Sequence, residues 1–219
     1  MSSHEHHHPK ITTERRMTLA RRIRFLVLFT ISYNVIEAVV SLIAGNIAGS
    51  SALIGFGLDS VIEVSSALAV AWQFSGNDHE AREKVALKII AVSFFGLATF
   101  VTYDAITSLI RHETPESSLI GIIVAVLSIL IMPTVSLLQR KTGVELGSHS
   151  AIADSKQTLL CTYMSIVLLV GLLANSALGW WWADSVAALI IAGLAVREGI
   201  EAWKGDNCSS AELLFDDTH

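Results

Sequence analysis

The stretch at residues 52–72, ALIGFGLDSVIEVSSALAVAW, decides the fold, because it is long and apolar enough to cross a bilayer as one helix. Within it, Asp59 and Glu63 are four positions apart, which places both carboxylates on one face of a helix, one turn apart. A charged side chain at the bilayer centre costs roughly 2.5–3.5 kcal/mol on insertion scales. Two neighbours of like sign cost more unless a cation or protons lie between them, so the pair predicts a cation site within a membrane.

The composition of the whole chain is that of a membrane protein. Of its 219 residues, 52% are hydrophobic and 16% are charged, whereas about 25% are charged in an average soluble domain. Six apolar segments each reach the roughly 20 residues that span the hydrocarbon core. The segments are residues 23–46, 50–74, 85–110, 118–138, 150–174 and 178–203. The sequence therefore predicts an all-α, integral, multi-pass membrane protein, a bundle of six transmembrane helices.

The basic residues predict the orientation, because Lys and Arg gather on the cytoplasmic side of membrane proteins. Thirteen of the 15 Lys and Arg residues lie on the side of the two termini, whereas Arg111 alone lies on the opposite side. Both termini are therefore expected in the cytoplasm. The expected domains are a cytoplasmic, His-containing basic tail at 1–22, the six-helix transmembrane domain at 23–203, and a short cytoplasmic acidic tail at 204–219. Whether the His-rich tail binds metal stays open.

A second pair of polar residues lies in the fifth span. Gln157 and Cys161 repeat the four-residue spacing of Asp59 and Glu63, and Asp154 falls on the same helical face. The second span runs inward and the fifth outward, so the two pairs are expected to face each other near the bilayer midplane. Carboxylate, amide and thiolate groups can all bind a divalent transition metal. The predicted metal ligands are Asp59, Glu63, Gln157 and Cys161.

Further polar residues in the spans have open roles. Glu37 lies in the middle of the first span and is costly there unless it faces the bundle interior. It is predicted to be an accessory ligand, a proton carrier or a buried structural partner, and Asn34 and Asp154 are grouped with it as accessory or proton-relay residues. Asp104 and Asp184 lie nearer the outer ends of the third and sixth spans, where they either line an outer vestibule or contact headgroups.

These motifs resemble those of the cation diffusion facilitator family of zinc, cobalt and cadmium efflux transporters. Residues 57–63, GLDSVIE, are similar to the family's second-helix motif of two ligands four apart, and residues 153–161, ADSKQTLLC, to its fifth-helix motif. The resemblance covers about residues 23–203 and predicts a cation-efflux transmembrane domain, which is expected to be a short form without the family's C-terminal cytoplasmic domain. Asp59 matches the usual ligand, whereas Glu63, Gln157 and Cys161 depart from it, which leaves the metal open.

The resemblance implies a secondary transporter of the plasma (inner) membrane that exports a divalent metal from the cytoplasm in exchange for protons. Zinc is expected first, with cadmium or cobalt as alternatives; a homodimer stays open, and neither a cofactor nor nucleic acid is expected. One alternative is a non-transporting metal-binding or regulatory membrane protein that keeps the fold. Another is an intramembrane enzyme. No histidine lies in any predicted span to activate Cys161, which argues against nucleophilic catalysis, so an enzyme is not expected.

Overall fold

The computed structural model describes residues 13–73, 79–146 and 149–204. Within these ranges the chain forms six α-helices and no strand, which confirms the predicted all-α fold. The helices are α1 (Thr13–Ala48), α2 (Ser51–Gln73), α3 (His79–Arg111), α4 (Leu119–Leu146), α5 (His149–Leu178) and α6 (Ala183–Lys204). α1 thus begins inside the segment predicted as a tail. The predicted His-rich start and nearly all of the acidic tail lie outside the described residues.

Four helices, α1, α3, α4 and α5, have described stretches long and apolar enough to cross a membrane. At 23 and 22 residues, α2 and α6 also have the length of a span. Each of these two helices carries charged residues: Asp59 and Glu63 lie on α2, and Arg197 and Glu198 lie on α6. The chain is a multi-pass integral membrane protein.

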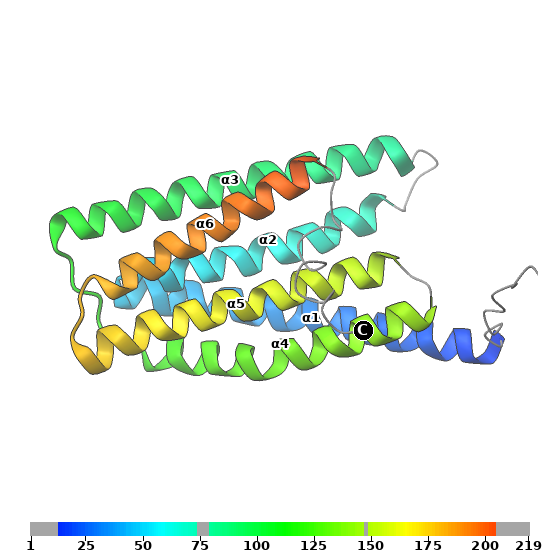
Figure 1. The fold of residues 1–219 in the computed structure, drawn as a ribbon, viewed down its shortest axis with the longest axis horizontal. Helices are drawn as coiled ribbons and strands as arrows, with labels where there is room; N and C mark the ends of the chain where they lie inside the picture. The colour runs from blue at the N-terminus through cyan, green and yellow to red at the C-terminus, as the bar shows by residue number, and fades with distance from the viewer. Residues whose placement is uncertain (1–12, 74–78, 147–148, 205–219) are drawn as a thin grey trace, which may run out of the picture.

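The helices run side by side along the long axis of the molecule, and α1 begins at the end toward which α6 finishes (Figure 1). We call this the terminal end; it is the side predicted to be cytoplasmic. The α1–α2, α3–α4 and α5–α6 connections lie at the opposite, far end (Figure 1). α2 packs against α1, α3, α5 and α6, so its two carboxylates lie inside the bundle.

Glycines let α1 and α2 approach closely. A Cβ at Gly45 would lie 2.9 Å from the backbone nitrogen of Ile54, and one at Gly57 would lie 3.0 Å from the backbone nitrogen of Leu42. Real side chains are not accommodated at such distances without a shift of the backbone. The close approach brings the polar face of α1 onto α2.

Carboxylates fasten the start of α2 at the far end. Asp184 of α6 is fully buried and accepts hydrogen bonds from the Ser50 hydroxyl at 2.5 Å and the Ala52 N–H at 3.3 Å. It therefore caps the N-terminus of α2, where backbone N–H groups lack helical partners. The two roles expected for Asp184, vestibule lining and headgroup contact, are both wrong. Asp104 of α3 accepts a hydrogen bond from the Ser51 hydroxyl at 2.6 Å, so it too holds the start of α2.

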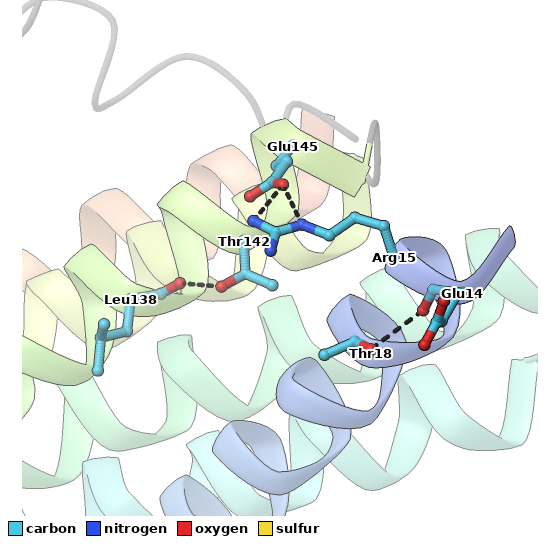
Figure 2. Close-up of polar contacts among 6 residues, drawn as sticks. All are labelled: Glu14, Arg15, Thr18, Leu138, Thr142 and Glu145. Atoms are coloured by element: carbon cyan, nitrogen blue, oxygen red, sulfur yellow. Dashed lines mark hydrogen bonds and ion pairs between the residues drawn. The ribbon is translucent and has the colours of Figure 1, made fainter. Parts of the chain in front are cut away.

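At the terminal end an ion pair joins α1 to α4. Arg15 Nη2 and Nε each lie 2.7 Å from Glu145 Oε1 (Figure 2). Thr18 and Thr142 donate their hydroxyls to carbonyls of their own helices nearby (Figure 2). The Arg15 and Glu145 side chains are 57% and 36% exposed, and such surface pairs contribute about 0–1 kcal/mol. The contact therefore adds little to the stability of the fold.

Candidate metal site

Buried polar side chains from α1, α2, α4 and α5 meet in the interior of the bundle. They include Thr30, Asn34, Glu37, Asp59, Ser60, Glu63, Ser128, Gln139, Thr158 and Cys161. Polar groups withdrawn from water are costly unless they are hydrogen-bonded, so the partner of each one matters. Apart from Asp59, they form two hydrogen-bonded groups at different depths, one around Glu37 and one around Glu63.

Glu37 on α1 is linked to three other helices. Its Oε2 accepts hydrogen bonds from the Ser60 hydroxyl of α2 at 2.9 Å and from the Cys161 thiol of α5 at 3.7 Å. Its Oε1 accepts a hydrogen bond from the Ser128 hydroxyl of α4. Glu37 therefore has the contacts of a buried structural partner. The bond to Cys161 also places it beside one of the predicted metal ligands, so the accessory and proton-carrier roles stay predictions.

Asn34 and Glu63 form the second group. Asn34 Nδ2 donates a hydrogen bond of 2.6 Å to Glu63 Oε2. Both side chains border a cavity of about 20 Å³, together with Thr30, Gln157 and Thr158. A cavity of this size has room for about one water-sized occupant. α1, α2 and α5 thus surround a small space whose lining is mixed, because the apolar residues Val27, Ile31 and Val64 also border it.

Gln139 of α4 is hydrogen-bonded to two of the residues that line this cavity. Its Nε2 donates to Thr30 Oγ1 at 3.4 Å, and its Oε1 accepts from Thr158 Oγ1 at 3.1 Å. The amide therefore ties α1 to α5. Sequence reasoning missed both Gln139 and Ser128, although a signal was present: both lie on the buried face of α4, which otherwise consists largely of small and apolar residues.

Asp59 differs from the other buried carboxylates because it makes no hydrogen bond or ion pair with another residue that the structure describes. It is 4% exposed. Its main electrostatic interactions are with Glu198 of α6 and with Glu37, both of the same sign. Glu198 was also missed from the sequence, where its signal was an acidic residue inside the sixth apolar segment. Carboxyl groups of like charge in a dry interior favour the binding of protons or of a cation.

The four-ligand site stays a prediction. Glu63 and Gln157 border the same cavity, whereas the Cys161 thiol is hydrogen-bonded to Glu37. Cys161 interacts electrostatically with Glu63, Glu37 and Asp59, so the predicted ligands share one region. Across the described ranges, however, no three His, Cys, Asp or Glu side chains are grouped so that they could hold a metal ion in this conformation. The side chain of Asp154, on α5, lies outside the described residues.

Comparison with known proteins shows that the chain matches one protein family. Residues 27–204 match the family model of the cation efflux transmembrane domain. The cation-efflux pump FieF of Shewanella oneidensis is 24% identical over 61% of this chain and 47% of its own length. The magnetosome protein MamB of Magnetospira sp. (strain QH-2) is 24% identical over 73% of this chain and 57% of its own. The uncharacterized transporter MJ0449 of Methanocaldococcus jannaschii is 26% identical, over 78% and 64%. The chain spans about half to two thirds of the length of these relatives.

Proposed function

Because the chain belongs to the cation efflux family, we propose that it is a secondary transporter that exports a divalent transition metal from the cytoplasm in exchange for protons. This membership confirms the resemblance drawn from the paired motifs. Zinc is the proposed cargo, with cadmium and cobalt as alternatives. The observation that supports the proposal most is Asp59, a carboxylate buried in the bundle without a hydrogen bond or ion pair to any described residue. A cation would compensate its charge.

The proposed ligands are the predicted four, Asp59 and Glu63 of α2 with Gln157 and Cys161 of α5. In the present conformation the Cys161 thiol donates a hydrogen bond to Glu37, so it can bind metal as a thiolate only after losing its proton and this hydrogen bond. Carboxylates and thiols bind metal in their deprotonated forms, so metal binding releases protons and protonation expels metal. This linkage supports exchange between metal and protons.

The packing of the helices supports a movement that opens and closes such a site. α1 packs chiefly on α2, and α4 on α5, whereas the direct contact between α2 and α5 is less extensive. Ser136 of α4 donates a hydrogen bond of 2.6 Å to the carbonyl of Ser155 on α5, which strengthens the second pair. A small tilt between the pairs would change the distance between the α2 and α5 ligands, as alternating access requires.

The rival proposal is a non-transporting metal-binding or regulatory protein with the same fold. It has the same buried carboxylates and differs only in that metal does not cross the membrane. Metal movement into sealed vesicles therefore separates the two.

A growth assay in metal-sensitive cells tests the proposed site. Wild type should give zinc resistance, and Asp59→Ala should abolish it while the protein still inserts, because removing one of several like charges relieves repulsion in the empty protein. The matched control is Glu113→Ala, which removes an exposed carboxylate and should keep resistance. Full resistance with Asp59→Ala would refute the site.

A further inference from the structure

We propose that Asn34 of α1 is a ligand of the transported cation, and that Asn34, Glu63 and Gln157 form an all-oxygen loading subsite. The proposal rests on the proposed function, because the subsite would lie on the same transport pathway. It adds a ligand from the first helix to a site otherwise drawn from the second and fifth. It also places the position where the cation first binds at a different depth in the bundle from Asp59 and Cys161.

The two ends of the Asn34 amide have different surroundings. Nδ2 donates to Glu63 Oε2 at 2.6 Å, whereas Oδ1 is buried and has no hydrogen-bond partner in the described part of the chain. An ionised carboxylate only accepts hydrogen bonds, so ionised Glu63 requires the N–H end of the amide to face it. Asn34 is 3% exposed, and a buried carbonyl oxygen without a donor is costly. A cation would satisfy this oxygen without turning the amide.

The cavity beside Asn34 has room for a small cation, and its polar residues lie beside the apolar Val27, Ile31 and Val64. Its volume is about 20 Å³, room for about one water-sized occupant, and Glu63 and Gln157 line it together with Asn34. Gln157 makes no hydrogen bond with another described residue, so its amide oxygen can turn toward the cavity. One carboxyl group and two amide groups offer a cation three oxygen ligands.

The hydroxyl groups of the lining favour a cation over an anion. The Thr30 hydroxyl donates a hydrogen bond to the Leu26 carbonyl at 3.0 Å, and the Thr158 hydroxyl donates one to Gln139 Oε1 at 3.1 Å. Because both hydroxyl hydrogens are used in these hydrogen bonds, each hydroxyl oxygen can act toward the cavity only as an acceptor. The polar lining therefore presents acceptors.

The position of the cavity along the helices makes it the first part of the site reached from the terminal end. Glu63 lies one helical turn, about 6 Å, nearer that end than Asp59, and Gln157 lies equally nearer than Cys161. The lining continues along α1 to Val27, in the same direction. Oxygen donors suit harder ions than a thiolate does, so the subsite would admit a range of divalent cations before Cys161 selects among them.

Equilibrium binding of Zn²⁺ to the purified full chain in detergent, measured by calorimetry, tests the assignment. Asn34→Ala should weaken binding at least about tenfold, because even changes behind a metal ligand cost about 10–100-fold. Asn34→Asp loses the N–H donor to Glu63 but keeps an oxygen, so it should bind Zn²⁺ at least as tightly as wild type. Asn46→Ala, which removes an exposed Asn from the same helix, should bind as wild type does.

The Asp variant separates a ligand from a merely structural hydrogen-bond donor, since loss of the donor would harm both Asn34 variants equally. Equal losses in the two variants, or unchanged affinity in Asn34→Ala, would overturn the ligand role. If Asn34→Ala does not fold, weaker binding by Asn34→Asp alone would overturn it. Zn²⁺ flux by the wild type is measured in parallel. If the wild type transports Zn²⁺ but Asn34→Ala binds Zn²⁺ as tightly as wild type, only the subsite is refuted. If the wild type does not transport Zn²⁺, the proposed function is refuted, and the binding data still decide whether the subsite exists.

Discussion

The thiol of Cys161 on α5 donates a hydrogen bond to Glu37 Oε2 on α1, with 3.7 Å between sulfur and oxygen. Both side chains are at most 2% exposed. The same carboxylate accepts hydrogen bonds from Ser60 and Ser128, so one residue of α1 links α2, α4 and α5. A metal ion bound to the Cys161 thiolate would replace the S–H proton, and the link between α1 and α5 would be lost. Metal binding and helix packing are therefore coupled at this pair.

Glu37→Ala should destabilise the protein markedly. The buried hydroxyls of Ser60 and Ser128 would lose their carboxylate acceptor, and each buried polar group left unsatisfied costs about 1–3 kcal/mol. Glu37→Gln keeps one acceptor oxygen and should lose less. Thermal unfolding of the detergent-solubilised protein measures the difference. A Tm of Glu37→Ala equal to that of wild type would show that these hydrogen bonds do not stabilise the bundle.

Cys161→Asp should shift the metal preference from cadmium toward harder divalent ions. A thiolate favours soft ions, whereas a carboxylate favours hard ones. The ratio of cadmium to zinc uptake in vesicles measures the shift, with wild type as the reference. An unchanged ratio would mean that Cys161 does not contact the transported metal and serves only as the donor to Glu37.

Gly45→Ala should lower stability, because its Cβ would lie 2.9 Å from the backbone nitrogen of Ile54 and force α1 away from α2. Overpacking of this kind costs about 1–3 kcal/mol. Gly193→Ala is the matched control: a Cβ added there would meet no atom of the described residues within 4 Å, and the same change in an open helical site stabilises by about 0.4–1 kcal/mol. The two Tm shifts should have opposite signs, and a Gly45→Ala protein as stable as wild type would contradict the close approach.

Asp184→Ala should loosen the first turn of α2. The carboxylate accepts from the Ser50 hydroxyl and the Ala52 N–H, and loss of such a cap costs about 0.5–2 kcal/mol. Hydrogen exchange at the start of α2 should therefore become faster than in wild type, and Asp184→Asn, which keeps one acceptor, should lie between the two. If hydrogen exchange at the start of α2 is as slow in Asp184→Ala as in wild type, Asp184 does not stabilise this helix end.

Most of the fold could be predicted from the sequence, because a hydrocarbon layer demands long apolar helices. The helix ends could not be predicted in the same way. The fourth apolar segment was expected at 118–138, but α4 continues to Leu146, and the first was expected from 23, but α1 begins at Thr13. Hydropathy marks the part of a helix suited to hydrocarbon, whereas the helix itself continues beyond it and is joined there by contacts such as Arg15 with Glu145.

The candidate site was predictable only where it depended on one helix at a time. Spacing within α2 places Asp59 and Glu63 on one face by helix geometry alone. The contact of Asn34 with Glu63 depends instead on how closely α1 and α2 pack, which the sequence of neither helix encodes by itself. The role of Asp184 was likewise mistaken, because the need for an acceptor at the start of α2 becomes apparent only when α6 lies beside it.

The central claim is that a divalent metal and protons exchange at the buried carboxylates of α2. Zinc flux in proteoliposomes under an imposed proton gradient tests it most directly. With an acidic interior, protons leave, and zinc should enter vesicles that contain wild type, whereas Asp59→Ala vesicles should take up no more than protein-free ones. Zinc uptake that ignores the proton gradient, or that persists in Asp59→Ala, would contradict the account.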